Sequence, residues 1–237
     1  MSSANRERLE VVQQSSASSA LLARILKDYY NSKIKGKPTI NIRQDTEAEL
    51  DSILRHFMVM SYQQQANKIN DRFKALRFYD LGQEDNQAID NALHTIEDKF
   101  YFKINEVENR NQGLEFNDVA AISIGVTGNI SVRDRLDPYA YIAGVANAVA
   151  FGALSLAVKT VPPVIISKVE PKKADQISNN WIWKYLTRND NNVCDNWERA
   201  CRPLHNREFE MLDPNTPNPP FDRHIHCRCT MVLIKKR

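Results

Sequence analysis

A long uncharged run in the middle of this chain limits its possible folds more than any other feature. The run extends from Tyr139 to Val158 and is rich in alanine. It is long enough to cross a bilayer as a helix, and Gly144, Ala148 and Gly152 form a small-residue face that allows close helix approach. Because the run contains Asn147 and lacks strong aromatic and basic flanks, we expect a central helix buried in a bundle or an oligomer. Membrane contact through residues 139–158 is the less favoured alternative.

Apolar residues recur at three- and four-residue spacing in three segments that precede this run. The spacing predicts one helix over residues 9–31 and another over residues 86–109. Between them, a helix should begin near Asp45 or Thr46, where either residue can act as the cap, and should continue with a break to Phe78. We expect the apolar stripes to pack in a core or to associate with other helices.

Prolines mark the expected end of the apolar helix. Val161 is followed by Pro162 and Pro163, which lack the backbone N–H that a helix interior requires. Residues 164–169 then read as a short strand or an extended linker, while residues 119–126 could form either a short buried helix or a strand. We place the domain boundary near 168–173.

The second part of the chain has the pattern of a small α+β module. Residues 174–186 predict a short helix that leads into a strand, and residues 208–212 and 230–234 predict two further strands joined through a proline-rich loop. The expected fold class is therefore mainly α. A helical oligomerisation or docking region would occupy residues 1–168, and a Cys/His-rich module would occupy residues 169–237.

All four cysteines of the chain lie in this module, with histidines close to them. Thiolate and imidazole ligands in two clusters joined by a loop are typical of a tetrahedral structural zinc site, which predicts a bound Zn ion. Cys229 is the main alternative to Cys227, because neighbouring sulfurs of a Cys-x-Cys pair rarely bind one ion comfortably. His205 and His226 are reserve ligands. The preferred ligand set is Cys194, Cys201, His224 and Cys227.

The overall composition excludes several classes of protein. A net charge of +3 is too small for a dedicated nucleic-acid binder. The cysteines are too few and too clustered for a secreted disulfide scaffold, and the polar, serine-rich beginning of the chain shows no secretory signal. We therefore expect synthesis in a reducing cytoplasm. Since clustered cysteines more often bind metal than act as nucleophiles, we expect no enzymatic activity.

Three short elements in the module have the order and spacing of a known pattern. The residues are Trp183, Thr187, Asp190, Val193 and Cys194 in the first element, Cys201, Leu204 and Phe209 in the second, and Pro219, Pro220, His224, Cys227, Arg228 and Cys229 in the third. Together the three elements resemble the phage head-morphogenesis family, which includes the minor head protein F of phage Mu. One departure is that Asn206 stands where the family usually has glycine, although asparagine can also take a left-handed conformation.

The resemblance implies a structural protein of a virion. It would be a minor head protein of a tailed phage that acts in head assembly or genome delivery, with the portal protein or the major capsid protein as its partner. A homo-oligomer in the head or at the portal vertex is expected after assembly in the host cytoplasm. Short basic segments could touch packaged DNA non-specifically. The alternative is a zinc-dependent or membrane-active protein delivered with the genome.

Overall fold

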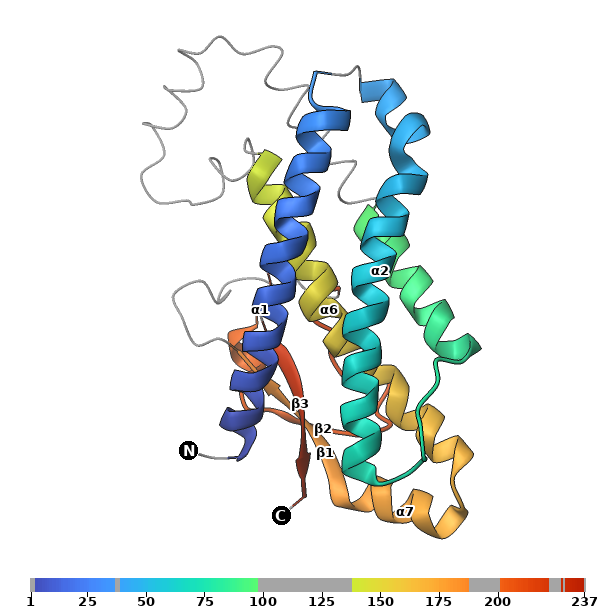
Figure 1. Ribbon diagram of the computed structural model, residues 1–237. Coiled ribbons are helices and arrows are strands. Elements are labelled where there is room, and N and C mark those ends of the chain that lie inside the picture. Colours follow the sequence, from blue (N-terminus) through green and yellow to red (C-terminus); the bar gives the residue numbers. More distant parts are fainter. Residues whose placement is uncertain are drawn as a thin grey trace.

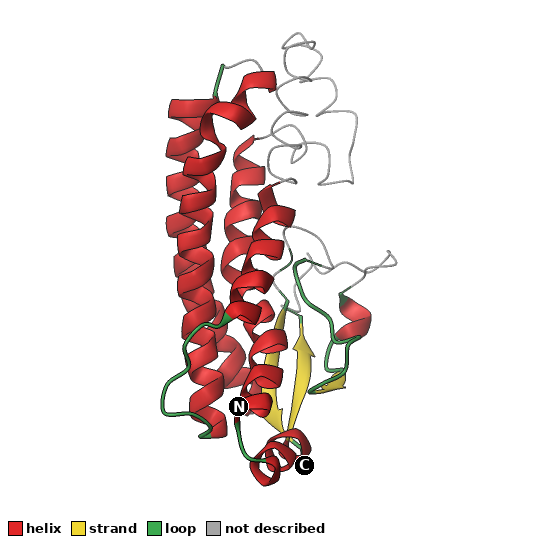
Figure 2. Cartoon of the chain, turned by 90° about the vertical axis from the view of Figure 1, so that its right-hand side faces the viewer, coloured by secondary structure: helices red, strands yellow, loops and turns green. Residues whose placement is uncertain are grey.

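The computed structural model shows a bundle of long helices with a small antiparallel sheet packed against one end (Figures 1 and 2). It describes residues 3–36, 39–97, 138–187, 201–221, 227 and 229–236. The predicted fold class is confirmed, because the described chain is mainly helical and its strands and clustered cysteines lie in the C-terminal part. The segment 119–126, for which the sequence allows a helix or a strand, lies outside the described residues.

Helix α6 (Pro138–Lys168) is the centre of the bundle and packs against both α1 (Ser3–Tyr29) and α2 (Thr39–Phe73). Almost every side chain of α6 from Ile142 to Val158 is buried, which confirms the expected central helix. By length and composition α6 could cross a membrane, but 78% of its most apolar window is buried inside the molecule. The bundle itself therefore supplies the apolar surroundings that this helix requires.

The prediction that prolines end this helix is wrong. Pro162 and Pro163 lie inside α6, which continues to Lys168, so the strand or linker expected over residues 164–169 is wrong as well. Each proline removes one backbone hydrogen bond from the helix. On both sides of them Val161, Val164 and Ile165 are buried in the core. Burial of these side chains outweighs the local preference of the two prolines for a helix end.

Helix α2 also differs from its prediction. It begins at Thr39 rather than at the predicted caps and runs without a break to Phe73, where Lys74 takes a left-handed conformation with φ of 48°. Thr46 therefore lies inside the helix, and its side chain is buried. Burial of Thr46 beside Tyr29, whose hydroxyl bonds to the Thr46 carbonyl, outweighs the local preference of threonine for a cap position.

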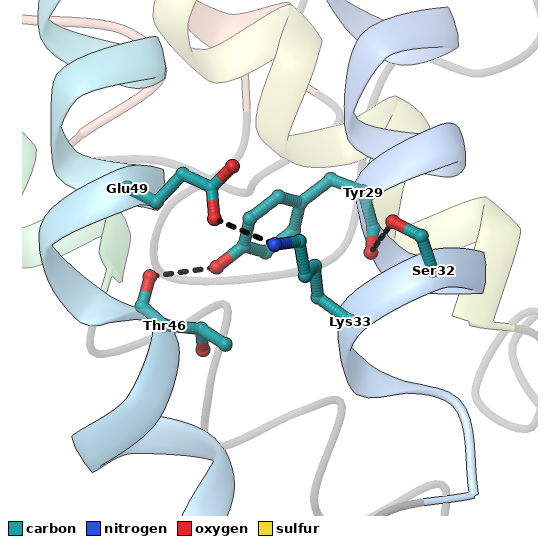
Figure 3. A network of polar contacts seen from close by, with 5 residues as sticks. All are labelled: Tyr29, Ser32, Lys33, Thr46 and Glu49. Carbon is teal, nitrogen blue, oxygen red and sulfur yellow. Dashed lines mark hydrogen bonds and ion pairs between the residues drawn. The ribbon is translucent and has the colours of Figure 1, made fainter.

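Polar contacts join the end of α1 to the first half of α2 (Figure 3). A π-helical turn, Tyr30–Ile34, follows α1. The hydroxyl of Tyr29 donates a hydrogen bond of 2.6 Å to the carbonyl of Thr46, and Lys33 pairs with Glu49 at 3.5 Å. The side chains of the ion pair are about half exposed, so the pair adds little stability. The hydrogen bond of the buried Tyr29 therefore contributes most of the stability of this contact.

A buried carboxylate fixes the next helix, which covers residues 83–97 before the described chain is interrupted. The Asp85 side chain is fully buried and accepts hydrogen bonds from the hydroxyls of Tyr62 and Tyr79, at 2.5 and 2.8 Å, and from the amide of Gly82 at 2.9 Å. Burial, followed by the proximity of Asp85, raises the pKa of both tyrosines far above the usual value, so their hydroxyls stay protonated donors. Asp85 thereby connects this helix to α2.

The sheet contains the strands that the sequence predicts. Helix α7 (Pro171–Asn180) leads directly into the central strand β1 (Trp181–Leu186), which pairs antiparallel with β2 (Glu208–Glu210) and with β3 (Thr230–Lys235). In the centre of β1, the fully buried Trp183 stands between Phe209 and Leu233 on the neighbouring strands. The expected helix-to-strand segment and the two further strands are confirmed.

The proposed division into residues 1–168 and 169–237 stays a prediction. Helix α6 ends at Lys168, where the first region was expected to end. However, buried side chains from both regions form one continuous hydrophobic cluster. The guanidinium of Arg72 in α2 also donates a hydrogen bond of 3.1 Å to the carbonyl of Leu233 in β3. The module is therefore built onto the bundle through shared core packing.

Candidate metal centre

Three cysteines meet in the interior where the sheet faces α6. The sulfur atoms of Cys201, Cys227 and Cys229 lie within 4.8 Å of one another, and those of Cys201 and Cys227 are 3.7 Å apart. All three side chains are buried. Such a group of sulfurs could hold a metal ion.

The local chain path brings these cysteines together from two directions. Cys201 precedes a 3-10 turn, Arg202–Leu204, that leads back towards β1, where the amide of Asn206 donates to the carbonyl of Tyr185 at 2.8 Å. Cys227 and Cys229 lie just before β3, which is paired with the other side of β1. Strand β1 is therefore the frame that fixes both cysteine-bearing segments.

Helix α6 also holds the cysteine-bearing chain in place. The side-chain amide of Asn147 in α6 donates a hydrogen bond of 2.8 Å to the backbone carbonyl of Cys227. Asn147 is buried, so this bond satisfies a polar group that would otherwise destabilise the interior. The one amide in the apolar run thus positions the chain at the cysteine cluster.

The sulfur geometry fits a tetrahedral metal site. Metal–sulfur bonds of about 2.3 Å and tetrahedral angles separate two sulfur ligands by about 3.8 Å. The Cys201–Cys227 distance of 3.7 Å matches this separation. Three sulfurs supply three corners of a tetrahedron, so a fourth ligand is needed to close the site.

The predicted ligands are only partly covered by the described residues. Cys201, Cys227 and Cys229 are brought together, whereas Cys194, His224 and His226 lie outside the described part of the chain. The sulfurs of Cys227 and Cys229, which the sequence treats as alternatives, both lie in the cluster, and which of them binds a metal stays a prediction. Both residues precede the first residue of β3, so the alternation of a strand does not force their side chains to opposite sides.

The reserve ligand His205 has a different role. Its Nδ1 atom accepts a hydrogen bond of 3.2 Å from the amide of Thr187 and lies 2.9 Å from the Thr187 hydroxyl. His205 is not a member of the cysteine cluster. The next residue, Asn206, has φ of 66°, which confirms that it adopts the left-handed conformation expected from the sequence.

The surroundings keep the thiols of Cys227 and Cys229 protonated while no cation is bound. Hydrogen bonding with Cys201 is the largest cause that raises the pKa of Cys229 to about 12, and the pKa of Cys227 is also raised, first by Cys201 and then by Cys229. The buried hydroxyl of Tyr185 lies close to these sulfurs but has no well-oriented hydrogen bond within the described residues. A cation would stabilise the thiolates, and a thiolate would give this hydroxyl an acceptor.

These raised pKa values predict that metal binding strengthens with pH. Binding must displace the thiol protons, so the apparent affinity should rise about tenfold per pH unit for each proton released, or up to about a thousandfold for three. Competition with a chromophoric chelator at pH 6, 7 and 8 measures this slope. An affinity that stays constant over this range would show that the thiols are not the ligands.

Close packing on α6 holds the loop that leads to the cysteines. A side chain added at Gly152 would place its Cβ only 2.5 Å from the ring of Phe221 and 3.2 Å from Pro220. Pro220 is the last residue of the proline-rich loop, residues 213–220, that the sequence predicts between β2 and β3, and Phe221 follows it. Glycine at this position lets the loop rest directly on the helix.

We expect Gly152→Ala to destabilise the protein by about 1–2 kcal/mol, because the Phe221 ring must move out of a packed position. Urea denaturation measures the change. In the background of Phe221→Ala the same substitution should have a much smaller effect, because the clashing ring is gone. Equal effects in both backgrounds would contradict the contact.

No protein-family model, curated protein or solved structure matches this chain. Sequence reasoning missed Asn147 and Tyr185 as members of the site. An amide within an otherwise apolar run was a usable signal for Asn147, whereas nothing distinguished Tyr185 from an ordinary core residue of a strand.

Proposed function

We propose that the cysteine cluster holds one structural zinc ion. Cys201, Cys227 and Cys229 would supply three ligands, and Cys194, His224 or His226 would supply the fourth. Sulfur and imidazole ligands suit zinc, and four protein ligands leave no open position for substrate. The buried position of the three described sulfurs supports a closed, structural site rather than a catalytic one.

We further propose that the chain is a minor head protein of a tailed phage, related to the head-morphogenesis family, and not an enzyme. One observation supports this proposal above the others. Described parts of the three resembling elements lie together in the fold. Strand β1 and Thr187 contact the segment from Cys201 to Phe209, and Cys201 meets Cys227 and Cys229. Matching residues that come together in the fold argue against a chance resemblance.

In this function the protein acts by binding. The zinc-stabilised module fixes the chain against α6, while the long helices offer surfaces that can oligomerise or dock on a portal or major capsid protein. A few copies at the portal vertex or in the head would then act in assembly or in genome delivery. The protein would reach this place from the host cytoplasm, where heads are assembled.

Mass spectrometry of purified virions tests the proposal. The chain should be present in far fewer copies than the major capsid protein, and it should co-purify with the portal protein when the two are produced together. A Cys201→Ser, Cys227→Ser variant should be absent from virions. Normal virions that contain none of this protein would overturn the assignment.

A further inference from the structure

A basic pocket lies at the end of the molecule opposite the α1–α2 connection, where the end of α2, the start of β1 and the end of β3 meet (Figure 1). Its volume is about 410 Å³. Four cationic and two aromatic side chains line it, with no acidic residue among the lining residues. These side chains are Arg72, Phe73, Lys74, Trp181, Lys235 and Lys236.

Two of the four cations are already engaged within the protein. Arg72 donates to the carbonyl of Leu233, and Lys236 pairs with Glu210 at 2.6 Å. Within the described part of the chain, no acidic side chain pairs with Lys74 or Lys235. These two ammonium groups are thus available to an anion from outside.

The helix end beneath the pocket does not repel an anion as strongly as an ordinary one. A helix C-terminus carries partial negative charge on its last carbonyls. Here the ammonium of Lys173 donates to the carbonyls of Lys74 and Ala75, the second at 3.2 Å. A fifth cation therefore lies beside the pocket and offsets this partial charge.

The aromatic residues give the pocket an apolar wall. Trp181 is half-buried, and its ring meets that of Phe73 edge-on, with 5.7 Å between the ring centroids. The ammonium of Lys235 lies 5.7 Å from the centre of the Trp181 ring. A cation placed beside a partly exposed indole can contact a phosphate while the indole stacks on the attached base.

We propose that this pocket binds a nucleotide unit of a single-stranded nucleic acid. Lys74 and Lys235 would contact the phosphate, and Trp181 would stack on the base. The volume is far larger than a free phosphate needs and falls within the range of small-molecule pockets. The site is separate from the cysteine cluster, and the proposal does not depend on the proposed virion function.

Fluorescence anisotropy with a labelled oligothymidylate and the purified full-length chain tests the phosphate contacts. Lys74→Gln and Lys235→Gln together should weaken binding at least tenfold near physiological salt. They should also make the slope of log K against log salt shallower by about 0.7, since the neutralisation of one phosphate is lost. The matched control is Lys35→Gln, an exposed lysine just before the other end of α2, about 50 Å away. It should change affinity less than twofold.

Trp181→Ala tests the base contact. It should weaken binding about tenfold without changing the salt slope, because stacking releases no counterions. Circular dichroism and urea denaturation identify variants that fail to fold, and Trp181→Phe then serves as the milder variant that keeps a stacking surface. A duplex of equal length should bind more weakly than the single strand.

Several outcomes overturn the proposal. These are no binding of the oligonucleotide, an equal loss in Lys35→Gln, an unchanged affinity in Trp181→Ala, and tighter binding of the duplex. Competition by inorganic phosphate as effective as that by thymidine oligonucleotide would indicate a simple anion site and would also overturn it. Zinc content should be unchanged in every pocket variant. A negative result for nucleotide binding can therefore be distinguished from a negative result for zinc binding.

Discussion

The Cys201→Ser, Cys227→Ser double variant should lose its bound zinc and the folded structure of the C-terminal module. Two of the three described sulfurs would be gone, and the remaining ligands could not hold an ion tetrahedrally. In small zinc modules binding contributes about 10 kcal/mol or more to folding, so the loss of order should be large. Elemental analysis and limited proteolysis measure the two effects, and the wild-type chain should contain one zinc.

His205→Ala is the matched control for this experiment. The histidine was a reserve ligand by sequence, but it is bonded to Thr187 and does not belong to the cysteine cluster. Its removal should leave the zinc content unchanged. Freshly reduced wild-type protein without metal would contradict the zinc assignment, and so would a double variant that keeps its full zinc content.

Asp85→Ala should destabilise the bundle by about 3–4 kcal/mol. The substitution removes an acceptor that satisfies three donors, so the buried hydroxyls of Tyr62 and Tyr79 and the amide of Gly82 lose their partner. Hydrogen bonds to a charged group contribute about 1.5–3 kcal/mol each, and relaxation recovers part of the sum. Urea denaturation followed by circular dichroism measures the change.

Asp90→Ala on the same helix is the control. Asp90 pairs with Arg55 at an exposed position, so its loss should change the free energy of unfolding by less than about 1 kcal/mol. Comparable effects of the two substitutions would show that Asp85 is not a buried connection. Tyr62→Phe should fall between the two, because it removes one donor and leaves the carboxylate two others.

The uncharged run and the strand patterns predicted the parts of the fold that burial determines. A long uncharged segment such as α6 is stable only where its side chains are buried, and the short apolar segment around Trp183 was predicted as a strand. The helix ends were less predictable. Pro162 and Pro163 were read as a stop because local propensity is visible in sequence, whereas the burial of Val161 and Ile165 against distant helices is not.

The sequence predicted the type of candidate site, a cysteine-rich metal site, but not how its residues are arranged in space. Clustered cysteines predict metal binding from residue type alone, and Asn206 predicts its own backbone conformation. That the sulfurs of Cys227 and Cys229 both lie in one cluster depends on where β3 begins, and the support from Asn147 depends on an approach between residues 80 positions apart. The basic pocket likewise requires Lys74 and Lys235 to meet through the tertiary fold.

The order of segments along the chain has a consequence during synthesis. Helices α1, α2 and α6 precede the cysteine-bearing segments, so they can pack while a ribosome is still adding residues 201–236. Until then Asn147 and Gly152 lack their contacts with Cys227 and Phe221. An apolar helix with one uncovered side is a surface that chaperones bind and that promotes aggregation. The C-terminal segment is therefore also a cover for α6, and the nascent chain is most prone to aggregate before that cover is in place.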